Sequence, residues 1–122
     1  MRPSLTLDEF TALAEQYSVV PICVEVLADR FTPVSLFERL VGDSDGFLLE
    51  SVEGGERWAR WSFVGWSPAF TVRSFDGKSS SDSDSVDIPA GDPLDVLEQL
   101  TDRYETPPDD ALGFPGPVPP LH

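Results

Sequence analysis

The residues with the clearest chemical potential lie in two apolar segments that a pair of glycines separates. Glu50 and Ser51 stand near the end of the first segment, and Arg60 lies in the second. Because side chains alternate along a strand, Arg60 would share one strand face with Trp58 and Trp66. A guanidinium flanked by apolar side chains is partly desolvated and favours an anion as its partner.

Two interpretations of this constellation stay open. In the first, the groups hold a zwitterion: Arg60 binds a carboxylate, Glu50 binds an ammonium group and Ser51 adds a hydrogen bond. In the second, Glu50 and Arg60 form a cross-strand ion pair with the guanidinium stacked on tryptophan, worth at most about 1 kcal/mol. The spacing alone favours the ion pair.

The chain offers little for catalysis. It has one histidine, His122, and one cysteine, Cys23, which lies in an apolar run typical of a buried and unreactive thiol. The sequence contains no phosphate-binding glycine loop, no nucleophile beside a base and no cluster of metal-ligand residues. We therefore predict no catalytic residue, no metal site and no cofactor in this chain.

Length and composition indicate one globular domain. The chain has 122 residues, of which 40% are hydrophobic, and a formal net charge of −14. That charge argues against nucleic acid and anionic membranes as partners, and no apolar run is long enough to span a bilayer. A single cysteine and the absence of a signal-like start predict a cytoplasmic protein.

Start signals predict three helices. Thr6 and Glu9 have the spacing of a capping box. Thr32-Pro33 and Asp92-Pro93 each place a proline directly after an N-cap residue. The apolar positions expected to face the core are Phe10, Leu13, Ala14 and Tyr17, then Leu36, Phe37, Leu40 and Val41, and finally Leu94, Leu97, Leu100 and Tyr104.

Runs of β-branched and aromatic residues predict the strands. They cover residues 19–27, 46–52, 58–66, 69–75 and 85–89. Gly54-Gly55 predicts a hairpin between the second and third strands, and the serine-rich residues 79–85 predict a mobile loop. Together with the helices, this order predicts an α+β fold, with an antiparallel sheet built on a hairpin meander and about three helices packed against it.

Residues 106–122 differ in composition from the rest, because they hold half of the twelve prolines. Such a segment forms neither a regular helix nor a central strand. We predict an α+β domain over residues 1–105 and a Pro-rich linker or arm over residues 106–122. A connector of this kind usually joins two domains, so we expect the chain to be cut from a longer one.

Three segments carry a resemblance to a known family. Phe-Thr-Pro-Val-Ser-Leu-Phe at 31–37, Phe-Leu-Leu-Glu-Ser at 47–51 and Arg-Trp-Ser-Phe-Val-Gly at 60–65 resemble the N-terminal region of anthranilate synthase component I. The resemblance implies a parent lyase that converts chorismate and glutamine or ammonia into anthranilate and pyruvate with Mg²⁺, the first step of tryptophan biosynthesis. It also implies a glutamine amidotransferase subunit (component II) as partner, and a C-terminal catalytic domain, outside this chain, that holds chorismate and the metal.

The resemblance further implies allosteric feedback inhibition by tryptophan. In the family, a Leu-Leu-Glu-Ser segment and a basic residue on the next strand contact this effector. The matching positions here are Leu48, Leu49, Glu50 and Ser51, with Arg60 as the basic residue. The rest of that site belongs to the missing part, so we expect the fragment alone to be inactive and to bind tryptophan weakly.

Two alternative functions stay open. The N-terminal region of aminodeoxychorismate synthase component I, of folate and 4-aminobenzoate synthesis, is similar in pattern, and tryptophan inhibition of the full chain would separate the two enzymes. The other alternative is an independent acidic protein-binding module that uses Trp58 and Trp66 as an exposed patch.

Overall fold

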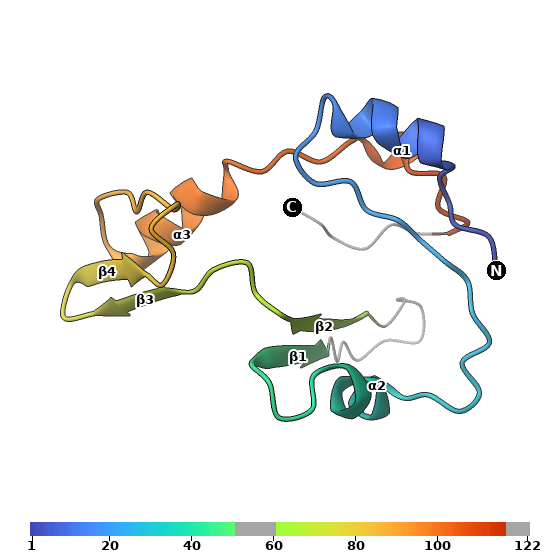
Figure 1. Cartoon of the computed structure of the whole chain (residues 1–122), viewed down its shortest axis with the longest axis horizontal. Helices are drawn as coiled ribbons and strands as arrows, with labels where there is room; N and C mark the ends of the chain where they lie inside the picture. Colours follow the sequence, from blue (N-terminus) through green and yellow to red (C-terminus); the bar gives the residue numbers. More distant parts are fainter. Residues whose placement is uncertain (51–60, 117–122) are drawn as a thin grey trace, which may run out of the picture. The chain divides into compact units, whose positions relative to one another are not determined.

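The computed structural model describes residues 1–50 and 61–116 (Figure 1). The chain divides into two compact units, one made of Met1–Glu25 and Phe70–His122 and the other of Val26–Ala69. In the described ranges it has three α-helices and two two-stranded antiparallel sheets, so the predicted α+β class is confirmed. No helix within those ranges is long and apolar enough to cross a membrane.

Helix α1, Leu7–Ala14, begins at the predicted capping box. The Thr6 hydroxyl accepts the backbone N–H of Glu9 at 3.3 Å, and the Glu9 carboxylate accepts the N–H of Thr6 at 2.7 Å. Two backbone donors that a helix start leaves free are thereby satisfied. Of the predicted core-facing stripe, Phe10, Leu13 and Tyr17 are half-buried, whereas Ala14 is exposed.

The capping box makes Glu9 a reporter of helix α1. The hydrogen bonds from Thr6, first from its backbone N–H and then from its side chain, lower the Glu9 pKa from its ordinary value of 4.5. Glu9 therefore stabilises the fold above pH 4.5, and this contribution is lost as the pH falls through the lower folded-state pKa. We expect NMR titration to show the lowered pKa in the unmodified chain and a partial return toward the ordinary value in Thr6→Ala, because alanine loses the hydroxyl but keeps the backbone N–H. The same Glu9 pKa in both proteins would contradict the hydrogen bond from the Thr6 hydroxyl to the Glu9 carboxylate.

Strands β3, Val72–Phe75, and β4, Lys78–Ser81, form a hairpin through Asp76-Gly77. Both turn residues have positive φ, +49° and +72°, which is the conformation that Asp-Gly adopts in a tight hairpin. The prediction of a loop from residue 79 onward is therefore wrong for residues 79–81. The turn comes before the serine run, so these serines form the returning strand, and the strand predicted over 85–89 is not formed.

The strand predicted over residues 19–27 is also wrong. Only one isolated bridge, between Val24 and Pro3, occurs there. Two hydrogen bonds next to this bridge hold the two segments together. The N–H of Ser4 donates to the Cys23 carbonyl at 2.8 Å, and the Cys23 N–H donates to the Ser4 hydroxyl at 3.0 Å. Strand propensity reflects packing against neighbouring strands, and the described residues provide no partner strand here.

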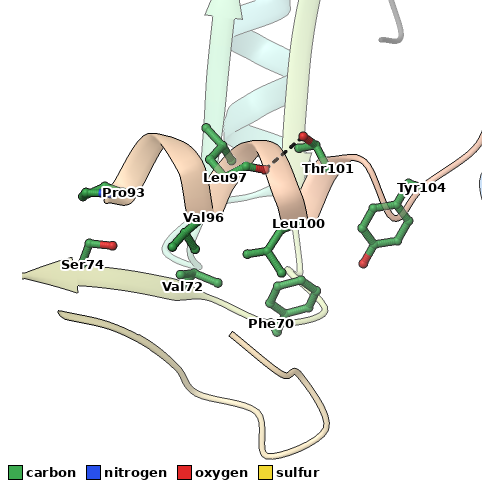
Figure 2. A pocket seen from close by; sticks show the side chains of 9 residues that line it. All are labelled: Phe70, Val72, Ser74, Pro93, Val96, Leu97, Leu100, Thr101 and Tyr104. Atoms are coloured by element: carbon green, nitrogen blue, oxygen red, sulfur yellow. Dashed lines mark hydrogen bonds between the residues drawn. The ribbon is translucent and has the colours of Figure 1, made fainter. Parts of the chain in front are cut away.

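Helix α3, Pro93–Thr101, begins at Asp92 as predicted. Its buried side chains are Val96 and Leu100, at 1% and 7% exposure. Figure 2 shows both pointing from the helix toward the β3 side of the unit. The predicted face is correct only for Leu100, because Leu94, Leu97 and Tyr104 are at least half exposed.

The segment after α3 packs against the start of the chain, next to α1 in Figure 1. Glu105 donates its N–H to the Ser18 hydroxyl at 2.7 Å and accepts the Ser18 N–H at 3.1 Å. After the short 3₁₀ helix Asp109–Ala111, Leu112 is completely buried. The Pro-rich segment thus adds a core side chain to the larger unit, while the boundary at residue 105 and a linking role for 106–122 stay predictions.

Candidate functional site

The unit Val26–Ala69 carries the residues predicted to bind an effector. Helix α2, Pro33–Leu40, precedes strands β1, Gly46–Glu50, and β2, Ser62–Trp66 (Figure 1). The predicted helix start is confirmed, because the Thr32 hydroxyl accepts the Ser35 N–H at 3.1 Å. The helix is followed by Gly42, whose φ of +57° is the left-handed conformation that often ends a helix.

Helix α2 packs on one face of the β1–β2 pair. Val41, which follows the helix, is only 4% exposed. Gly46 lies directly against it, since a Cβ on Gly46 would come within 2.5 Å of the Val41 Cγ1. Side chains alternate along a strand, so Leu48 and Glu50 share this face with Gly46.

The antiparallel pairing predicted for the two strands is confirmed within the described residues. Leu48 pairs with Val64, Leu49 with Phe63 and Glu50 with Ser62. Ser51 and Arg60 lie outside the residues that the structure describes. The predicted contacts of Arg60 with Glu50 and Ser51 therefore stay predictions.

The structure separates two neighbours of the predicted site. Leu48 lies on the α2 face and is half-buried, whereas Leu49 lies on the opposite face and is 61% exposed. Phe47 shares the outer face, and its ring covers the position where a Cβ of Gly65 would lie. One small ligand can contact both leucines only if it reaches them across the strand backbone.

One polar residue near the predicted site was missed. Ser62 stands opposite Glu50, and both residues are exposed. A carboxylate can accept hydrogen bonds from an ammonium group, and a hydroxyl can donate to an anionic oxygen. Alternation along the strand predicts that Ser62 shares a face with Arg60, but only the register of the strand pair shows that it stands opposite Glu50.

The described groups of the β1–β2 pair are few and do not include a metal-ligand cluster. Among residues 1–50 and 61–116, no group of three or more His, Cys, Asp or Glu side chains could hold a metal ion. The described part of the β1–β2 pair offers one carboxylate, one hydroxyl and two apolar faces. This composition is typical of a recognition surface for an amphipathic small molecule.

The chain shares sequence with several curated relatives. Anthranilate synthase component 1 of Acetivibrio thermocellus is 39% identical over 102 residues, which are 82% of this chain and 21% of the relative. That of Mycolicibacterium smegmatis is 40% identical over 102 residues, 81% of this chain and 20% of the relative. The chain is similar to part of anthranilate synthase component 1.

A longer match supports the same conclusion. Anthranilate synthase component 1 of Mycobacterium tuberculosis is 38% identical over 121 residues, which are 93% of this chain and 22% of the relative. The predicted resemblance is confirmed, and the chain spans about a fifth of the length of these relatives, consistent with an N-terminal portion. No family model and no solved structure matches the chain.

Proposed function

We propose that this chain is the N-terminal portion of an anthranilate synthase component 1 and that its β1–β2 pair forms part of a tryptophan feedback site. The observation that carries the proposal is the 39% identity over 82% of the chain. The geometry supports it, because Glu50 and Ser62 lie opposite each other on a strand pair with two apolar faces.

In the proposed parent, chorismate and glutamine-derived ammonia are converted into anthranilate and pyruvate. This chain contributes binding and regulation, and we expect it to be inactive alone. The Mg²⁺ of the parent and a second component that supplies ammonia would be bound by residues outside this chain. The described residues contain no cluster that fits a metal ion, so we assign the chain no role in holding it.

The proposed mechanism is allosteric. The Glu50 carboxylate would accept the ammonium group of tryptophan, Arg60 would bind its carboxylate, and an apolar hairpin face would contact the indole. The remaining wall of the site would come from the rest of the parent. Tryptophan then favours an inactive arrangement, and it can shift the equilibrium by no more than its difference in affinity for the two arrangements.

Ser51→Phe in the full-length parent tests this function. A phenyl ring next to Glu50 should obstruct the effector but not the distant reaction centre. We expect the tryptophan concentration for half-inhibition to rise by at least about tenfold, with the uninhibited rate changed less than about twofold. The measurement is the rate of anthranilate formation against tryptophan concentration.

Ser80→Phe is the matched control, because Ser80 is an exposed serine on β4 in the other unit. It should leave both the uninhibited rate and the inhibition unchanged. Undiminished inhibition in Ser51→Phe would refute the assigned site. A parent that makes aminodeoxychorismate instead of anthranilate would favour the folate-pathway alternative.

A further inference from the structure

Helix α3 is apolar over a wider arc than its internal contacts use. Val96 and Leu100 are buried, whereas Leu94 and Leu97 are 76% and 57% exposed. At about 100° per residue, these four positions span an arc of about 160°. The buried side chains occupy only one end of that arc. The other end, at Leu94 and Leu97, is more than half exposed.

A groove lies next to this exposed stripe, between α3 and the β3 side of the hairpin. Its volume is about 330 Å³. Figure 2 shows the side chains that line it, and the larger ones are Phe70, Val72, Val96, Leu97, Leu100 and Tyr104. We call this groove, together with Leu94, the α3 surface.

Of the three polar side chains that line the groove, Ser74 and Thr101 are engaged in hydrogen bonds, and the third is the half-exposed Tyr104. The Thr101 hydroxyl donates to the Leu97 carbonyl at 3.0 Å (Figure 2). The Ser74 and Ser79 hydroxyls share a hydrogen bond at 2.5 Å. The groove therefore presents mainly carbon to an occupant, which favours a packed apolar side chain over a polar metabolite.

The charges around the α3 surface restrict its occupant. Helix α3 carries Asp95 and Glu98, is flanked by Asp92 and Asp102, and contains no lysine or arginine. The basic residues of the adjoining segments are Arg73 on β3 and Arg103, which donates to the Asp87 carbonyl at 2.9 Å. A second copy of this chain, with net charge −14, would bring like charges together. The complementary surface is apolar with lysine or arginine at its edge.

We propose that the α3 surface docks the part of anthranilate synthase component 1 that lies outside this chain, through an apolar surface edged by basic residues. The inference rests on the proposed function. The relatives extend far beyond the matched portion, since the chain covers 20–22% of their length. Docking within one polypeptide has a high effective concentration, so a small apolar area is sufficient.

Site-specific alkylation at position 97 tests the proposal. Leu97→Cys, with Cys23→Ser to remove the native thiol, is treated with a thiol reagent, and labelling of its peptide is followed by mass spectrometry. We expect the rate in the full-length parent to be at least about tenfold lower than in the 122-residue chain. Leu7→Cys in the same background is the control, because Leu7 is 78% exposed on α1 and should react readily in the 122-residue chain.

Three results would overturn the docking. Equal rates at position 97 in chain and parent would show that the rest of the parent does not cover it. Protection in the chain alone that grows with concentration would assign the surface to a second copy. Protection in the chain at every concentration would assign it to another part of this chain. The two proposals can fail separately. If position 97 is unprotected in the parent but tryptophan still inhibits it, only the docking proposal is refuted. If position 97 is protected but tryptophan does not inhibit the parent, only the feedback role is refuted.

Discussion

Leu112→Ala should lower the free energy of unfolding of this chain by about 3 kcal/mol. Leu112 is 0% exposed, although it lies in a Pro-rich segment that resembles a linker in composition. The substitution removes buried carbon atoms and leaves a cavity. That loss is large against a typical total stability of about 5–15 kcal/mol. Denaturant unfolding followed by circular dichroism measures it as a lower midpoint.

Leu7→Ala is the matched control, since it makes the same chemical change at a position that is 78% exposed. Its effect should stay within about 0.5 kcal/mol. Equal effects of the two substitutions would contradict the packing of residues 106–116 in the larger unit. The comparison therefore tests the segment after α3 independently of any function.

The helix starts could be predicted from the sequence because capping is a local interaction. Thr6 and Glu9 are three residues apart, and both of their hydrogen bonds form in the structure. Thr32-Pro33 and Asp92-Pro93 likewise begin helices. At each helix start, the capping residues and the helical turn that they stabilise lie within the same few residues.

The strands could be predicted less well because pairing is not local. Residues 19–27 have high strand propensity but form only the isolated bridge at Val24. Asp76-Gly77 was a local signal for a turn, and it outweighs the serine composition that predicted a loop from residue 79. For α3 the sequence shows the width of the apolar arc but not which end is covered.

The site was predicted as residues 48–51 together with Arg60 on the next strand, without the register in which the two strands pair. Leu48 and Leu49 are adjacent in sequence but lie on opposite faces of β1. Ser62 is twelve residues from Glu50, yet the two are cross-strand partners. The family resemblance indicated residues of β1, and alternation along a strand already separates Leu48 from Leu49. Only the pairing register shows that Ser62 stands opposite Glu50.

Gly46→Ala should lower the free energy of unfolding by about 2 kcal/mol or more. Its Cβ would come within 2.5 Å of the Gly65 carbonyl oxygen and of the Val41 Cγ1. Neither can easily yield, because the first is backbone of the paired strand and the second belongs to a side chain that is 4% exposed. Strand β1 must therefore shift relative to both β2 and Val41. Denaturant unfolding of the chain measures the loss.

Gly116→Ala provides the matched control, because nothing lies within 4 Å of the Cβ it would add. It should be neutral or slightly stabilising, since alanine restricts the unfolded chain more than glycine does. In the parent, Gly46→Ala should also weaken tryptophan inhibition, because the displaced strand carries Leu48 and Glu50. If Gly46→Ala behaved like Gly116→Ala in the chain, helix α2 would not pack on the Gly46 face. Leu48 and Glu50 would then lose the support that holds them in place for an effector.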